Sequence, residues 1–158
     1  MKKLLALIII LSTLVLCLSA CSEERSALAI CREFASAYGV EGAIYSPTVR
    51  EGEEGYVREG FFESLYGEPQ DSVRDYALLL LSDLDSIGEV GIFICESDYD
   101  ALLITEMLGR RLENIRRVAA SAGLGFPEGA FVMRKNKCVV LCAISDAERA
   151  ERILRRVI

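Results

Sequence analysis

The chain has 158 residues, with 24 acidic and 18 basic side chains and a formal net charge of −6, and this length suits one domain with a single core. Nucleic acid is a poor partner for such an acidic chain, because binding it depends on clustered Lys and Arg that neutralise phosphates. The sequence contains no histidine, which excludes Ser-His-Asp and Cys-His catalytic arrangements, zinc sites that use histidine, and a histidine general base.

The first 21 residues have the pattern of an export signal. Lys2 and Lys3 precede a mostly apolar run from Leu4 to Leu18, and small residues lead to Cys21. The tetrapeptide Leu18-Ser19-Ala20-Cys21 resembles the bacterial lipobox, in which the cysteine receives a diacylglyceryl group and becomes the first residue of the mature protein. The resemblance implies that residues 1–20 are a lipoprotein signal peptide and that lipid on Cys21 holds the chain on the extracytoplasmic face of the cell membrane.

Two other interpretations of this segment stay open. It also fits an ordinary cleaved signal, or an uncleaved anchor, since about 17 residues is the lower limit for a membrane-spanning helix. All three interpretations export the domain. Cleavage after residue 20 removes Lys2 and Lys3 and no acidic residue, so the exported part is more acidic than the whole chain.

After the leader, residues 23–38 are predicted to form an amphipathic helix that ends at Gly39. One face of this helix is apolar and carries Ala27, Ile30, Cys31, Phe34 and Tyr38. Residues 40–60, rich in glycine and acidic side chains, read as a loop with a short strand at 43–45 as an option. A short helix is then expected over residues 61–66, before Gly67 and Pro69.

Two hairpins follow, each succeeded by a helix. The first pairs residues 73–81 with 90–95 through a turn at 82–89, and its helix runs from Ser97 to about Ala122 with a loose Ser97-to-Asp100 capping box. The second pairs 130–134 with 137–144, and Ser145 and Glu148 form a capping box for the last helix. Both helices open with Ser-Asp, which suggests a weak internal duplication. The prediction is an α+β fold with a largely antiparallel sheet of about four strands in ββα-ββα order, its helices packed on one face, preceded by an N-terminal helix.

Several short motifs in residues 61–158 occur in a characteristic succession. They are Tyr66-Gly67, Asp75-Tyr76-Ala77, Glu89-Val90-Gly91-Ile92-Phe93, a helix with Leu108, Arg111 and Leu112, Phe126-Pro127-Glu128, Val139-Val140-Leu141 and Ile144-Ser145-Asp146. In this succession the stretch resembles a domain of unknown function from small lipoproteins of clostridia-like Gram-positive bacteria. The resemblance implies a Gram-positive envelope protein and supplies no activity and no catalytic residues. The expected organisation is a signal peptide over 1–20, a lipidated cysteine, helix and loop over 21–60, and the α+β domain over 61–158.

Four cysteines lie beyond the leader and the lipobox: Cys31, Cys95, Cys138 and Cys142. Cys138 and Cys142 fall on one face of a predicted strand about 13 Å apart, too far to bridge each other. There is no Cys-x-x-Cys motif, so neither a redox pair nor a zinc knuckle is indicated. The thiols are expected either to be free and buried or, for Cys95, to bridge to a neighbouring strand.

Arginines gather late in the two long helices, at Arg110, Arg111, Arg116, Arg117, Arg149, Arg152, Arg155 and Arg156. Helix C-termini favour cations, and pairs such as Glu151 and Arg155 have i,i+4 spacing, which is a structural explanation. The functional alternative is an anionic-ligand patch formed by Arg110, Arg111, Arg116, Arg117, Arg152, Arg155 and Arg156. That patch requires the two helices to pack side by side, where they would meet lipid headgroups or anionic wall polymers.

These observations predict a membrane-anchored extracytoplasmic lipoprotein that serves as a binding or accessory module in the cell envelope. Its expected partners are the membrane, through lipid on Cys21, and an envelope protein or wall polymer; no cofactor, metal or catalytic residue is predicted. The alternative is a histidine-free hydrolase that uses carboxylates on wall glycans or peptides. Such carboxylates need a separation of roughly 5 to 9.5 Å in a cleft, and the sequence singles out no pair.

Overall fold

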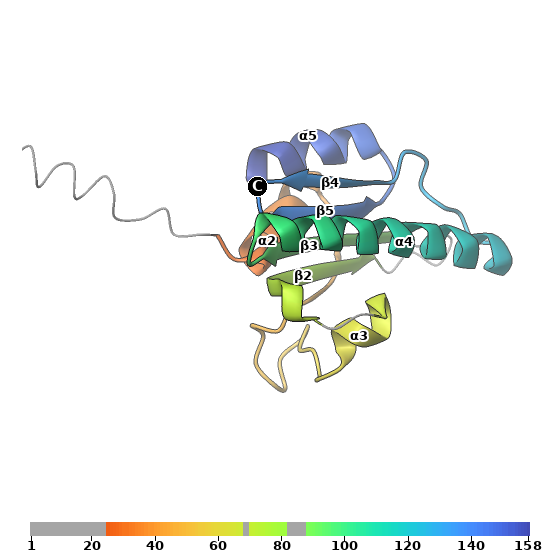
Figure 1. The fold of residues 1–158 in the computed structure, drawn as a ribbon. Coiled ribbons are helices and arrows are strands. Elements are labelled where there is room, and N and C mark those ends of the chain that lie inside the picture. The colour runs from red at the N-terminus through yellow and green to blue at the C-terminus, as the bar shows by residue number, and fades with distance from the viewer. Residues whose placement is uncertain (1–24, 68–69, 82–87) are drawn as a thin grey trace, which may run out of the picture.

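A computed structural model of the chain describes residues 25–67, 70–81 and 88–158. The predicted signal peptide, Cys21, the first residues of the first predicted helix and residues 82–87 of the first predicted turn lie outside this part of the chain. The helices are α2 (Ala27–Tyr38), α3 (Phe61–Tyr66), α4 (Asp98–Ala122) and α5 (Ala147–Val157), with a 3-10 turn η1 (Gln70–Ser72). The strands are β1 (Gly42–Tyr45), β2 (Val73–Leu81), β3 (Gly88–Cys95), β4 (Phe131–Lys135) and β5 (Cys138–Ala143) (Figure 1).

The strands form one antiparallel sheet in the order β1-β2-β3-β5-β4. Both predicted hairpins are confirmed, β2 with β3 and β4 with β5. Asn136, in the turn between β4 and β5, has a φ of 54°, a conformation that asparagine tolerates better than most residues. The α+β class is also confirmed, but the sheet has five strands because the short segment after α2 pairs with β2, Gly42 opposite Leu81.

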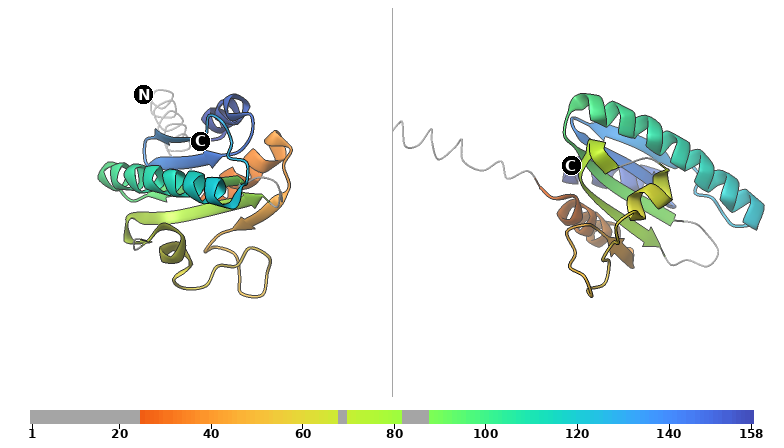
Figure 2. Two further views of the ribbon diagram at one scale, coloured as in Figure 1. Left: turned by 90° about the vertical axis from the view of Figure 1, so that its right-hand side faces the viewer. Right: turned by 60° about the horizontal axis from the view of Figure 1, so that its bottom comes forward.

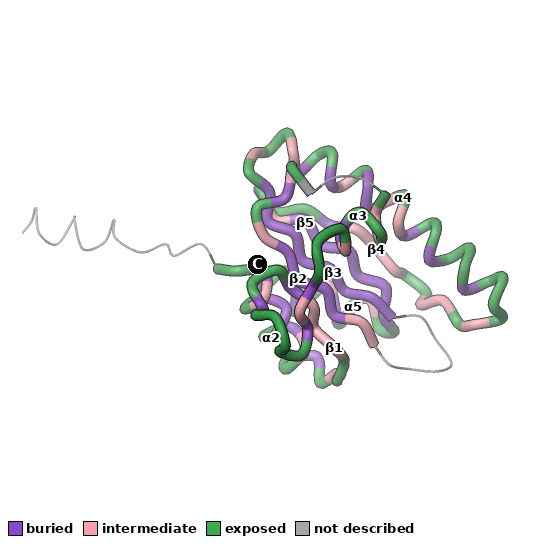
Figure 3. The backbone as a smooth tube through the Cα atoms, turned by 90° about the horizontal axis from the view of Figure 1, so that it is seen from below, coloured by how far each residue is buried: buried purple, intermediate pink, exposed green. Residues whose placement is uncertain are grey.

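The helices cover both faces of the sheet, which corrects the expectation that they pack on one. Leu79 and Ile92 belong to a core with α2 and α5, whereas Leu78 and Phe93 belong to a second core with α3 and α4. Figure 2 shows α4 on one side of the strands and α2 and α5 on the other, and Figure 3 shows the central strands buried. The physical reason is that β2 and β3 are apolar on both faces, so both faces must be kept from water.

The predicted duplication does not extend to three dimensions. If the two hairpins were copies, a twofold rotation would place β2 on β4 and β3 on β5. The axis of that rotation is perpendicular to the sheet, because β3 and β5 are antiparallel neighbours. Such a rotation keeps each helix on its own face. Since α4 and α5 lie on opposite faces, the two ββα units differ in the side to which their helix returns.

The cap of α4 is as predicted and the cap of α5 is not. Ser97 Oγ accepts a hydrogen bond from the backbone N–H of Asp100 at 3.1 Å. The N-cap of α5 is Asp146 instead of Ser145: its side chain accepts from the backbone N–H of Arg149 at 3.1 Å. Asp146 has a φ of 52°, and this left-handed turn starts the helix one residue later than the Ser145-to-Glu148 box would.

Helix α2 is part of the main fold. Its predicted apolar face is buried in full, Ser26 caps its N-terminus, and Gly39 ends it with a φ of 77°. The Tyr38 hydroxyl donates a hydrogen bond to the carbonyl of Ser145, and the Arg149 guanidinium lies 4.8 Å from the centre of the Tyr38 ring. Helix α2 therefore completes the same core as α5.

The four cysteines of the described chain are free. Cys31, Cys95 and Cys142 are buried and Cys138 is half-buried, as the first of the two expectations states. Cys138 and Cys142 face the α2–α5 core and Cys95 faces the other core. The alternative bridge from Cys95 to a neighbouring strand is absent from the structure.

Candidate functional site

Several elements begin or end together where the described chain starts, and we call this region the Arg25 end. Helix α2 begins there, β2 begins, β3 ends, β4 turns into β5, and α5 ends (Figure 1). A pocket of about 530 Å³ opens between them. Its lining residues are Arg25, Ile30, Arg74, Ile94, Asp98, Lys135, Asn136, Lys137, Cys138, Val157 and Ile158.

The pocket is cationic above an apolar floor. Four of its side chains carry a positive charge, on Arg25, Arg74, Lys135 and Lys137, and Asp98 alone among the lining side chains carries a negative one. Ile94, Val157 and other apolar groups form the floor, because here the α2–α5 core reaches the surface. The lining side chains of the pocket are thus net positive, whereas the whole chain has a net negative charge.

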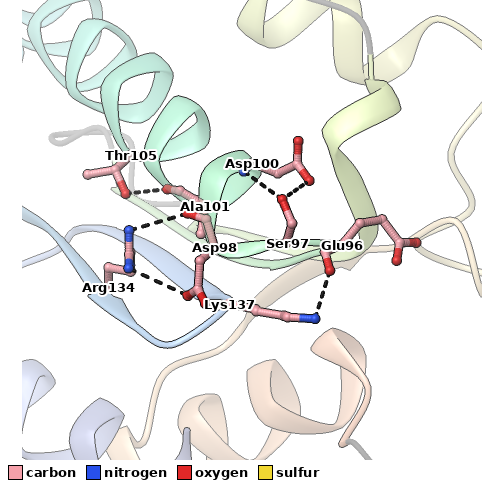
Figure 4. Close-up of polar contacts among 8 residues, drawn as sticks. All are labelled: Glu96, Ser97, Asp98, Asp100, Ala101, Thr105, Arg134 and Lys137. Atoms are coloured by element: carbon pink, nitrogen blue, oxygen red, sulfur yellow. Dashed lines mark hydrogen bonds and ion pairs between the residues drawn. The ribbon is translucent and has the colours of Figure 1, made fainter.

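Two acidic side chains at the start of α4, Asp98 and Asp100, have protein partners (Figure 4). Asp98 pairs with Arg134 at 3.5 Å, and Asp100 accepts a hydrogen bond from the Ser97 hydroxyl at 2.5 Å. Lys137 Nζ donates to the backbone carbonyl of Glu96 at 2.8 Å, and the Glu96 carboxylate points away from it. A neutral carbonyl does not cancel an ammonium charge, so Lys137 keeps its charge for a ligand.

Two other cations are tied to the end of α5. Arg25 donates to the carbonyl of Val157 at 2.8 Å and pairs with Glu33, and Lys135 donates to a main-chain oxygen of Ile158. The neutral carbonyl of Val157 orients the Arg25 guanidinium, and Glu33 partly neutralises that guanidinium. The arrangement can bind an anion that also has an apolar portion.

The arginines of the predicted patch are divided between the two faces. Arg110, Arg111, Arg116 and Arg117 belong to α4, whereas Arg152, Arg155 and Arg156 belong to α5 on the opposite face of the sheet. The two helices are thus not side by side, and the joint patch expected from the sequence does not form. Several of these arginines have local partners: Arg116 pairs with Glu113 and Arg155 with Glu151, both at 2.6 Å.

Arg111 has a different surrounding, because it pairs with a buried carboxylate. Its guanidinium lies 2.7 Å from Glu89, whose side chain is 2% exposed, and the Tyr66 hydroxyl donates to the same carboxylate at 3.1 Å. Burial alone would lower the pKa of Arg111, but the hydrogen bond and charge of Glu89 outweigh it and raise that pKa. Burial first, and then the Glu89 charge, raise the pKa of Tyr66 well above 10. This cluster links β3, α3 and α4 at the edge of the core.

Other candidate chemistry finds little support in the described part of the chain. Burial raises the pKa of Cys31, Cys95 and Cys142 to about 12 and that of Cys138 to about 11, so these thiols are poor nucleophiles at neutral pH. Within the described residues, no three Cys, Asp or Glu side chains gather as metal ligands. A second pocket of about 300 Å³ contains two acids, Glu148 and Glu151, and Glu151 is paired with Arg155.

The pocket cations were missed by sequence reasoning because they come from separate elements. Arg25 precedes α2, Arg74 lies in β2, and Lys135 and Lys137 flank the β4–β5 turn. Only the sheet order brings them together. The available signal was the Lys135-Asn136-Lys137 turn, two cations about a residue that favours a tight turn.

Comparisons with models of known protein families, with curated proteins and with solved structures give no match to this chain. The resemblance of residues 61–158 to a lipoprotein domain therefore stays a prediction. Among the helices that the structure describes, none has the length and apolar character needed to cross a membrane.

Proposed function

We propose that this protein is a lipid-anchored extracytoplasmic module of a Gram-positive cell envelope, with a binding or accessory role. The observation that carries the proposal is the leader that ends in Leu18-Ser19-Ala20-Cys21. Acyl chains on Cys21 provide a durable tether, since each buried methylene contributes about 0.8 kcal/mol and two or more chains hold well.

The position of the fold in the chain supports this proposal. The first helix that the structure describes is capped by Ser26 and begins at Ala27, only a few residues after Cys21. Among the described residues, both cores are built from residues 27 onward. Cleavage before Cys21 would leave every described helix and strand in the mature protein, on a short tether.

The binding role is supported by the pocket at the Arg25 end. Convergent charged groups above an apolar floor are typical of a ligand site. The resemblance to an envelope lipoprotein domain adds the expectation of an envelope partner, either a protein or a wall polymer.

Metabolic labelling with a palmitate analogue in a Gram-positive host tests the anchor. We expect the wild-type protein to be labelled and Cys21→Ala to be unlabelled. Cys17→Ala is the matched control, because this cysteine also lies in the leader and the proposal predicts that its loss leaves labelling unchanged. Equal labelling of Cys21→Ala and wild type would refute the proposal.

Crosslinking of the lipidated protein in its native membrane tests the accessory role. A single envelope protein recovered in stoichiometric amount supports it. Recovery of the protein alone, under conditions in which a known membrane complex is captured, contradicts a stable protein partner.

A further inference from the structure

We propose that the pocket at the Arg25 end binds the phosphate of anionic lipid headgroups, so that the domain rests with this end on the bilayer. The inference deepens the proposed function and rests on it for the position of the membrane. Phosphate is the ligand class, and a headgroup in the anchoring membrane is its source.

The first argument is the charge of the pocket. The chain as a whole has a net charge of −6, and this overall charge opposes its approach to an anionic membrane. Arg25, Arg74, Lys135 and Lys137 converge at one opening instead. Lys and Arg donors make short, charge-assisted hydrogen bonds to phosphate oxygens, and Lys135 and Lys137 are exposed.

The second argument is the position of the pocket relative to the tether. Arg25 lines the pocket and follows Cys21 by four residues, a span of at most roughly 14 Å when fully extended. A lipid on Cys21 would hold the pocket close to the headgroups, where a positive side chain is attracted within a Debye length of about 8 Å. Tethering also makes this encounter intramolecular in effect, which favours a weak site.

The third argument is an exposed apolar group beside the pocket. Tyr99, Leu102 and Leu103 are 68%, 54% and 40% exposed, and they lie in the first two turns of α4, whose first residue, Asp98, lines the pocket. Tyr is enriched at membrane interfaces, and Leu inserts at the boundary of headgroups and acyl chains. A free phosphate ion would gain nothing from these side chains or from the apolar floor, so they favour a lipid.

The test is vesicle flotation of the unlipidated protein that begins at residue 22. This protein keeps every described element and both described cores, which lie within residues 25–158. We expect it to float with vesicles that contain phosphatidylglycerol and not with vesicles of phosphatidylcholine alone, and we expect binding to weaken as salt is raised.

Two matched double variants locate the site. Lys135→Ala/Lys137→Ala removes two pocket cations and is expected to weaken binding by tenfold or more, on the basis of the attraction per Lys near an anionic surface. Arg116→Ala/Arg117→Ala removes two exposed cations near the far end of α4 and is expected to change binding less than threefold, roughly the worth of distant charges. Circular dichroism checks that both variants are folded.

A third variant separates the apolar contribution. Tyr99→Ser/Leu102→Ser is expected to weaken binding without changing its dependence on salt, whereas the lysine variant reduces that dependence because fewer cations contact the surface.

Three results would overturn the inference. They are equal weakening by the lysine and arginine double variants, absence of binding to phosphatidylglycerol vesicles at low salt, and competition by inorganic phosphate at concentrations equal to those of accessible lipid, which would assign the pocket to a free anion. None of these results alters palmitate labelling at Cys21, so a failure of this inference is distinguishable from a failure of the anchor.

Discussion

Glu89 is buried at the edge of the α3–α4 core, where its carboxylate pairs with Arg111 at 2.7 Å. Removing one partner of a buried ion pair leaves an uncompensated charge. We expect Arg111→Met to lower the free energy of unfolding by about 3 kcal/mol, measured by urea denaturation. Glu89→Gln/Arg111→Met is expected to be more stable than Arg111→Met alone, because no buried charge is then unpaired.

Arg116→Met provides the control for this prediction. Arg116 pairs with Glu113, and both side chains are at least half exposed, so its loss should cost less than about 1 kcal/mol. Equal destabilisation by Arg111→Met and Arg116→Met would show that the buried Arg111–Glu89 pair contributes no more to stability than the exposed Arg116–Glu113 pair.

The buried thiols make a second prediction. Since their pKa lies near 11 to 12, few are ionised at pH 8, and the thiolate is the reactive form. We expect the native protein beginning at residue 22 to react slowly with a thiol reagent at pH 8, with half-buried Cys138 first, and to release four reactive thiols when unfolded in urea. Fewer than four after unfolding without reductant would indicate a disulfide.

At the scale of elements, α5 is capped by Asp146, whereas the sequence predicted a cap at Ser145. Asp146→Ala removes the side chain that accepts from Arg149 and places alanine at a positive φ, so we expect a loss of about 1 to 2 kcal/mol in urea denaturation. Asp146→Gly should cost only a few tenths, because glycine adopts this conformation freely.

Ser145→Ala tests the same point from the other side. Its hydroxyl does not cap the observed helix, so this variant is expected to be nearly neutral. If Ser145→Ala lowered the free energy of unfolding by about 1 kcal/mol and Asp146→Ala did not change it, Ser145 would be the N-cap, as the sequence predicted.

Local patterns explain which elements could be predicted. The apolar face of α2 and the cap of α4 follow from spacing and neighbouring residues alone. The strand β1 is harder to predict because its four residues have no buried member and it is held by pairing with Leu78–Leu81, far along the chain. The face of the sheet on which each helix packs is likewise determined by contacts between distant parts of the chain. The neighbouring apolar residues Leu78 and Leu79 indicate only that both faces of β2 are buried.

At the scale of the molecule, the candidate site was the least predictable part. Its cations converge only because β2, β3, β5 and β4 take that order in the sheet and α5 returns to the same end. The arginines chosen from the sequence are numerous in two helices, but the sheet separates those helices. Charge counted along a helix does not reveal which helices are neighbours.

The most direct test of the central claim is the mass of the N-terminal peptide of the protein extracted from its native membrane. The account predicts a peptide that begins at Cys21 and carries the added mass of a diacylglyceryl group. An intact peptide from Met1 with an unmodified Cys21, found in protein from the soluble fraction, would contradict it.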